Sequence, residues 1–339
     1  MENVTIRMLA EKLQLSTATI SKALNNSHEI SEETRQRVLA LARELNYVPN
    51  LYAASLRKKS SRTIAVVIPE VADSFFAEAI NGIESVAREK GYHVLIYLTH
   101  ESADKEKTIL KDFQSGRVDG VLISVTTETA MAPQGLEQLS RGIPIVFFDR
   151  ICEGVAAAQV TTNDTAAASK ATDHLIAGGC KNIALLSPSR HLSISNKRAE
   201  GFRQAMAAHK YPVKESAIIY GTNDIAATVT RLKTALQRHH YDGLIATTEK
   251  LVTAVYQACD ELQLHIPNDV QVIGFSNLST ARFLNPSLTT ITQPAFDMGK
   301  TAATLLFKAL KSNRFQLRDQ QQEIPSILIK RKSTTTVSR

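Results

Sequence analysis

Small polar side chains gather near the start of the chain, in the stretch TIRMLAEKLQLSTATISKAL at residues 5–24. Hydroxyl groups and lysines alternate there with leucine and isoleucine at helical spacing, which predicts two short helices joined by a turn. Hydroxyls and a lysine can hydrogen-bond to phosphates and base edges, while the apolar face packs on neighbouring helices. Alone, the second helix would more often be an ordinary surface helix. Its place in a three-helix pattern before a basic linker favours a helix-turn-helix in the major groove of DNA.

Three hydroxyl residues mark the helix starts that position these groups. Thr5, Ser16 and Ser31 each precede a helical pattern, where a hydroxyl oxygen can accept a free backbone N–H of the first turn. We expect the third helix to be ended by Pro49. The sequence therefore predicts an all-α head at 1–48, followed by a basic stretch at 49–62 whose first half can become helical.

From Thr63 onward, apolar runs typical of buried parallel strands alternate with amphipathic helical patterns. The first series runs from TIAVVIP to IPIVFFD, and the rhythm restarts in a second series that ends with VQVIGFS. Such repetition predicts two α/β lobes with a ligand cleft beyond the strand ends. We expect a body at 63–339, with a first lobe formed by 63–161 and 293–318 and a second by 162–292 and 319–334.

The composition limits the class of protein. The chain has 339 residues, enough for two or three domains, and a net charge of +7. Residues 1–62 hold ten Lys or Arg against six Asp or Glu, so +4 of that charge lies in the region expected to meet DNA. We find no signal-peptide pattern or membrane-length apolar run, and the three cysteines form no CxxC. These features predict a cytoplasmic protein.

A series of strings resembles the LacI/GalR family of bacterial repressors over essentially the whole chain. The strings are VTIRMLAEKLQLSTATISKALN, LNYVPN, FFAEAINGIE, VDGVLI, IPIVFFDR, VIGFSN, PSLTTITQP and LIKRKST, in the family's order. The resemblance implies a helix-turn-helix head joined by a hinge helix to a two-lobed α/β body like that of periplasmic binding proteins. It also implies a dimer on a pseudo-palindromic operator in double-stranded DNA, and control by a small effector of sugar-like chemistry.

The resemblance also implies which residues contact DNA. Positions that match base contacts are Ile6, Thr17, Ala18 and Lys22. Positions that match phosphate or backbone contacts, or the hinge helix, are Thr5, Ser16, Thr19, Ser21, Asn25, Ser31, Thr34, Tyr47, Asn50, Ala53, Leu56 and Arg57. Leu56 matches the family's apolar wedge, which kinks the duplex in the minor groove; outside that context it would be a packing residue.

Matching the cleft motifs in the same way gives the expected effector-binding residues. These are Ser74, Phe75, Asp149, Arg150, Asn163, Asp164, Arg198, Glu249, Ser276 and Asn277. Convergent carboxylates, amides and a guanidinium suit a polyhydroxylated ligand. Taken singly, Arg198 could be a surface ion pair, and Asp149 and Asp164 could be helix caps.

The chain departs from the family pattern at several of these places. Lys22 and Ala54 stand where arginine is more common, Ser276 replaces the usual aspartate, and Thr248-Glu249 replaces the usual Asn-Asp. A lysine recognises guanine as a flexible point charge rather than as a fork, so we expect looser guanine preference. Loss of a carboxylate at 276 favours an acidic or modified sugar, or a non-sugar metabolite, unless Glu249 substitutes for it.

Other functions have less support. The adjacent His239 and His240 cannot face one ion, so we expect no metal, and no motif indicates a cofactor. There is no nucleophile elbow, so we expect no enzyme, although an α/β fold alone does not exclude one. A plain small-molecule receptor shares the two-lobed body but would lack the head. The leading hypothesis is therefore a dimeric, ligand-responsive repressor.

Overall fold

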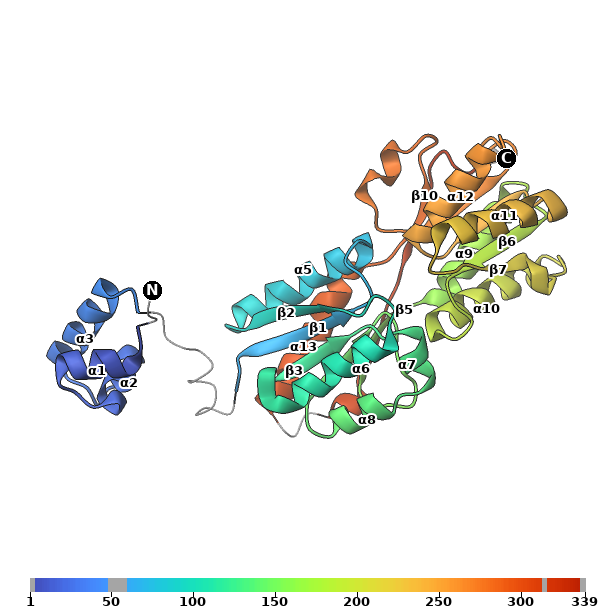
Figure 1. Cartoon of the computed structure of the whole chain (residues 1–339). Coiled ribbons are helices and arrows are strands. Elements are labelled where there is room, and N and C mark those ends of the chain that lie inside the picture. Colours follow the sequence, from blue (N-terminus) through green and yellow to red (C-terminus); the bar gives the residue numbers. More distant parts are fainter. Residues whose placement is uncertain (1–3, 48–59, 313–315, 336–339) are drawn as a thin grey trace. The chain divides into compact units, whose positions relative to one another are not determined.

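The computed structural model describes residues 4–47, 60–312 and 316–335. The chain divides into two compact units, residues 1–61 and 62–339, which correspond to the head and the body (Figure 1). In the part of the chain that the structure describes, no helix is both long and apolar enough to cross a membrane.

The head consists of three helices, α1 (Ile6–Leu13), α2 (Thr17–Leu24) and α3 (Glu32–Glu44). All three predicted caps are confirmed. The side chain of Thr5 accepts the Met8 N–H at 3.3 Å, Ser16 accepts that of Thr19 at 3.0 Å, and Ser31 accepts that of Thr34 at 3.3 Å. One apolar residue from each helix, Leu9, Ile20 and Val38, is fully buried at their junction. Such a small core rests on a few side chains, each worth about 1.5–3 kcal/mol of burial.

The expected role of Pro49 in ending α3 is wrong. The helix already ends at Glu44. Asn46 then has a φ of 49°, in the left-handed region, which turns the chain out of the helix before Pro49 is reached. Asparagine tolerates this conformation better than most residues.

The first lobe of the body is a parallel sheet in the order β11-β5-β4-β3-β1-β2. Its strands are β1 (Thr63–Ile68), β2 (His93–Leu98), β3 (Gly120–Ile123), β4 (Ile145–Phe148), β5 (Ala158–Thr162) and β11 (Gln321–Ile324). The helices of this lobe are α5 (Ser74–Glu89), α6 (Ala103–Asp112), α7 (Thr127–Met131), α8 (Gln134–Ser140) and α13 (Ala295–Lys311), with a π-helical turn at Phe113–Arg117. The central strands β1, β3 and β4 are almost wholly buried, as their apolar runs predict.

The second lobe repeats this plan in the order β12-β10-β9-β8-β6-β7. Its strands are β6 (Ile183–Ser187), β7 (Ile218–Tyr220), β8 (Gly243–Ala246), β9 (Gln271–Phe275), β10 (Thr289–Thr292) and β12 (Ile327–Ile329), of which β12 runs antiparallel to β10. Its helices are α9 (Asp164–Ala177), α10 (Ser193–Ala208), α11 (Ile225–His239) and α12 (Glu249–Glu261).

The chain crosses between the lobes after β5, after β10 and after β11. The expected return to the second lobe at residue 319 is therefore a few residues too early, because β11 (Gln321–Ile324) pairs with β5 in the first sheet. The mostly polar sequence QQEI forms an exposed edge strand, and its pairing depends on contacts far away in the sequence rather than on an apolar pattern.

Two helix pairs approach so closely that glycine is required at their contact. A Cβ on Gly82 of α5 would lie 2.1 Å from the carbonyl oxygen of Phe296, and one on Gly299 of α13 would lie 2.0 Å from that of Ala79. In the second lobe, a Cβ on Gly201 of α10 would lie 2.0 Å from the carbonyl oxygen of Thr165 in α9. Each lobe thus has one helix pair that packs backbone against backbone.

Candidate functional site

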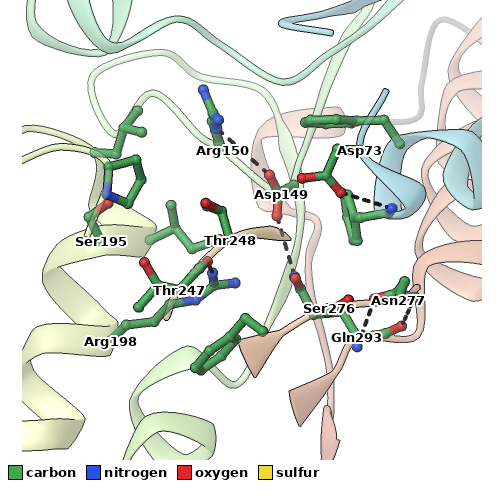
Figure 2. A pocket seen from close by; sticks show the side chains of 16 residues that line it. Asp73, Asp149, Arg150, Ser195, Arg198, Thr247, Thr248, Ser276, Asn277 and Gln293 are labelled. Carbon is green, nitrogen blue, oxygen red and sulfur yellow. Dashed lines mark hydrogen bonds and ion pairs between the residues drawn. The ribbon is translucent and has the colours of Figure 1, made fainter. Parts of the chain in front are cut away.

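A pocket lies between the two lobes of the body, where side chains from both sheets converge (Figure 2). Its empty volume is about 490 Å³, which includes space open to solvent. The lining residues are Asp73, Phe75, Phe76, Asp149, Arg150, Pro188, Leu192, Ile194, Ser195, Arg198, Thr247, Thr248, Phe275, Ser276, Asn277 and Gln293.

The guanidinium of Arg198 is held by several protein groups at once. Its Nε donates to Asp164 Oδ1 at 2.7 Å, and its Nη1 donates to the Thr247 carbonyl oxygen at 2.6 Å. Its Cζ lies 4.1 Å from the centroid of the Phe275 ring, a cation–π contact. The residue is only 4% exposed. Among the described residues, its Nη2 has no hydrogen-bond partner, and neither does the buried Ser195 Oγ. Both groups are therefore able to bind a solute in the pocket.

The second arginine, Arg150, is paired with an acid from its own lobe. Its Nη1 lies 2.5 Å from Glu101 Oε1, whereas its Nε lies 3.9 Å from Asp149 Oδ2. Burial by itself would lower the pKa of this guanidinium, but the two carboxylates outweigh burial and raise the pKa. Arg150 is therefore a permanent cation whose nearest partner is Glu101.

Two carboxyl groups of the first lobe face the pocket. Asp149 follows β4 with a φ of 63°, and Asp73 caps α5 by accepting the Phe75 N–H at 3.0 Å. Burial raises the pKa of Asp149. Burial, and then the nearby Glu249 carboxylate, raise the pKa of Asp73 to about 7. Both groups are costly to ionise in this environment.

Glu249, at the first turn of α12, joins the lobes. Its Oε1 accepts the Ser276 hydroxyl at 2.8 Å and the Asn277 N–H at 2.9 Å, both in the second lobe. Its Oε2 accepts the Ser74 N–H of α5, in the first lobe, at 3.0 Å. A second link nearby is the bond of 2.7 Å from Asn277 Nδ2 to Glu78 Oε2. The carboxylate of Glu249 is thus committed to protein donors.

The structure divides the expected effector-binding residues into two groups. The pocket lining contains Phe75, Asp149, Arg150, Arg198, Ser276 and Asn277. Outside the lining are Ser74, Asn163, Asp164 and Glu249. Asp164 and Glu249 instead position other groups, and the Asn163 side chain accepts the Ser326 N–H at 2.8 Å where the chain crosses between lobes. Binding by any of these residues stays a prediction.

Sequence reasoning missed several lining residues. Asp73 could have been found, because it directly precedes the helix that carries Phe75 and is a natural cap. Ser195 lies in the first turn of α10, which begins at Ser193, and no motif in its local sequence indicated a pocket residue. Gln293 and Thr247 occupy ordinary strand ends, and nothing in their local sequence indicates a pocket.

The face of the head that is expected to meet DNA is polar and accessible. Thr17, Ala18, Lys22 and Asn25 are exposed, as are the capping residues Thr5, Ser16 and Ser31, while Ile6, Thr19, Ser21, Thr34 and Tyr47 are partly buried. Lys22 forms an ion pair with Glu29. The Asn25 side chain donates to the Ser21 carbonyl oxygen at 2.8 Å. The hinge positions Asn50, Ala53, Leu56 and Arg57 lie outside the described residues.

Within the described ranges, no group of three or more His, Cys, Asp or Glu side chains could hold a metal ion. The three cysteines, Cys152, Cys180 and Cys259, are buried and free. Burial raises the pKa of Cys180 to about 12 and that of Cys259 to about 11, so both stay as thiols.

A helix-turn-helix head and a two-lobed body with a polar pocket define a ligand-responsive DNA-binding regulator. Comparison with known proteins supports this class. The model for bacterial regulatory proteins of the lacI family matches residues 5–50, and that for a periplasmic binding protein-like domain matches residues 172–334. The ribose operon repressor of Halalkalibacterium halodurans is 32% identical over 97% of each chain.

Solved structures agree with these matches. A LacI family regulator from Enterococcus faecium with bound ribose has a TM-score of 0.70 and 25% identity, over 81% of this chain and 100% of that one. The Lac repressor dimer bound to operator has a TM-score of 0.82 at 23% identity, over 98% and 99% of the two chains, and shows the shared fold. The chain belongs to the LacI family, and it is a DNA-binding transcriptional regulator.

Proposed function

We propose that this protein is a dimeric repressor whose operator affinity is set by a small hydroxylated metabolite bound between the lobes. The observation that carries this proposal is the state of Arg198, a buried cation that is fixed by Asp164 and Thr247 and whose Nη2 is left for a solute. Groups prearranged in this way favour a ligand with several oxygen atoms. The kinship with a ribose operon repressor supports a sugar or a sugar derivative.

The order of the chain suggests how the pocket communicates with DNA. Strand β1 begins at Thr63, directly after the segment that joins it to the head. After β1 comes Asp73, which lines the pocket. A ligand that binds one arrangement of the lobes better than another would increase the population of that arrangement. The position of the first lobe would change with it, and so would the spacing of the two heads in a dimer. Leu56 and the other hinge residues would transmit that change.

Selection of bound fragments from sheared genomic DNA, with the full chain at physiological salt, tests this proposal. We expect enrichment of a pseudo-palindrome with a flexible central pyrimidine–purine step, and neighbouring genes that nominate the effector. Repeating the selection with a metabolite extract should weaken or strengthen that enrichment. If no sequence is enriched in either condition, the head does not recognise an operator.

We infer that the cleft binds its solute without converting it, since the relatives are regulators. We also infer that the protein acts in the cytoplasm, where bacterial DNA is found. Recovery of the bound metabolite unchanged after incubation with the protein tests whether the cleft leaves its solute unconverted.

A further inference from the structure

The charges around the pocket do not balance. Two arginines line the pocket, and each is paired most closely with a carboxylate outside the lining, Arg198 with Asp164 at 2.7 Å and Arg150 with Glu101 at 2.5 Å. Of the carboxyl groups that do line the pocket, Asp149 has only a more distant cation, Arg150 Nε at 3.9 Å, and Asp73 has no ion pair among the described residues. With all six groups ionised, four carboxylates against two guanidinium groups leave a net charge of −2.

Asp149 is buried but has no close hydrogen-bond donor among the described side chains. It is 8% exposed, and its side-chain hydrogen bonds are long, 3.5 Å from Ser124 Oγ and 3.4 Å from Gln293 Nε2. Buried carboxylates in proteins are normally satisfied by close donors or by a paired cation. A donor from a bound solute would supply what this carboxylate lacks.

Asp73 lies beside Asp149 at the same side of the pocket (Figure 2). Its Oδ1 caps α5, and Glu249 and Asp149 both add negative potential at its position. Burial and these neighbours raise the pKa of Asp73 to about 7, because the opposing effect of the Arg150 guanidinium is smaller than theirs. A positive charge placed between the two carboxyl groups would be stabilised by both.

The second lobe offers the opposite chemistry. Arg198 Nη2 and Ser195 Oγ, both on α10, are buried without partners among the described residues. These groups can donate hydrogen bonds to hydroxyl or ring oxygens. The pocket therefore presents two carboxyl groups beside Arg150 on its first-lobe side and two unpaired donor groups on its second-lobe side.

We propose that the effector is a hydroxylated primary amine, such as an amino sugar, with its ammonium group between Asp73 and Asp149 and its oxygens toward Arg198 and Ser195. This inference rests on the proposed function of the cleft. It replaces the expectation of an acidic sugar. Even with serine instead of aspartate at position 276, the carboxylates around the pocket outnumber the guanidinium groups. An anionic sugar would meet like charges at Asp73 and Asp149.

Thermal unfolding of the full chain tests this inference. The probes are the small-molecule fraction of a bacterial extract, divided on a cation-exchange resin at neutral pH, and glucosamine, galactosamine and mannosamine beside their parent hexoses. We expect the resin-retained fraction to raise the melting temperature and the flow-through to have no effect. Mass spectrometry of compounds released from the protein then identifies the active species, which we expect to carry both an amine and hydroxyl groups.

Two variants assign the effect to the pocket. Asp73→Asn should weaken binding of the active amine by roughly 10- to 100-fold, as expected for loss of a charge-assisted hydrogen bond. The control is Asp224→Asn, because Asp224 caps α11 through the Ala226 N–H just as Asp73 caps α5, but lies outside the pocket lining. This control should bind as the unaltered protein does.

The outcomes separate the two proposals. Stabilisation by the flow-through alone, or by a parent hexose as strongly as by its amino form, would overturn the amine while leaving a metabolite-controlled cleft intact. A retained compound without hydroxyl groups would overturn the role of Arg198 and Ser195. If neither fraction shifts the melting temperature, both the inference and the proposed control by a metabolite fail.

Discussion

At the scale of single residues, Arg198 is held in one orientation by three protein partners. Replacing it with alanine would leave Asp164 as a buried, unpaired carboxylate and destabilise the fold by about 3–5 kcal/mol. Arg198→Lys is the sharper change, because it keeps a cation beside Asp164 but loses the planar fork. We expect Arg198→Lys to retain operator binding and to lose at least about tenfold in effector affinity. Titration of the effector in a DNA-binding assay measures both, and an unchanged response would place the ligand elsewhere.

Lys22 already has an ion-pair partner within the head, which the sequence did not reveal. Its ammonium group is paired with Glu29 within the head, so contact with a guanine must replace an existing ion pair. Lys22→Gln should reduce discrimination for guanine in each half-site by roughly 1–3 kcal/mol. Glu29→Gln should increase discrimination for guanine and tighten operator binding at low salt, because it removes the ion-pair partner of Lys22. Competition binding with operators altered at one base pair decides this point, and unchanged discrimination in Lys22→Gln would assign that base to another residue.

At the scale of elements, the α5–α13 contact depends on the absence of two side chains. Gly82→Ala and Gly299→Ala each place a methyl group near 2 Å from a carbonyl oxygen of the facing helix. We expect each change to lower the free energy of unfolding by at least about 1–3 kcal/mol, the usual cost of overpacking. Gly135→Ala in α8 is the matched control, because a Cβ there meets nothing within 4 Å and helix propensity should stabilise it by up to about 1 kcal/mol. Urea denaturation compares the three, and equal stabilities would mean that the helices can separate without cost.

The link between α12 and α5 depends on the length of one side chain. Glu249→Asp removes a methylene group. The shorter carboxylate should still accept the hydrogen bonds from Ser276 and Asn277, but it should lose the one from the Ser74 N–H. We expect the amide of Ser74 to exchange with solvent roughly tenfold faster, since local opening is less costly. Glu261→Asp is the control on the same helix, where Glu261 pairs with Lys233 on the surface. Hydrogen exchange followed by mass spectrometry distinguishes them, and equal exchange would show that the lobes are held by other contacts.

These elements also show what the sequence could predict. Caps such as Thr5, Ser16 and Ser31 act within one turn of a helix, and the buried strands carry continuous apolar runs, so both were predictable from local chemistry. The pairing of β11 with β5 was not, because an exposed polar strand has no pattern that names its partner. Glu249 was expected as a ligand group, and only its hydrogen bonds to two lobes indicate that it connects them. Contacts between distant segments therefore account for most of what was missed.

At the scale of the whole molecule, buried carboxyl groups make stability depend on pH. The pKa of Asp73 rises from 3.8 to about 7 in the folded chain, and burial raises that of Asp149 and Asp164 as well. Between these values the folded protein holds protons that the unfolded chain has released, so stability falls as the pH rises through this window. Asp73→Asn should flatten that fall by up to about 1.4 kcal/mol per pH unit. Urea denaturation across the window measures the slope, and an identical slope in the variant would contradict the assignment to Asp73.

The two bonds that connect α5 to the second lobe have a kinetic consequence. Glu249 and Asn277 hold Ser74 and Glu78 against the second lobe, so a solute that enters by separation of the lobes must wait until these bonds open. The bimolecular association rate should then lie well below the diffusion limit, and residence times should be long for a given affinity. A regulator built in this way would average out brief fluctuations of its metabolite and answer only to sustained changes in concentration.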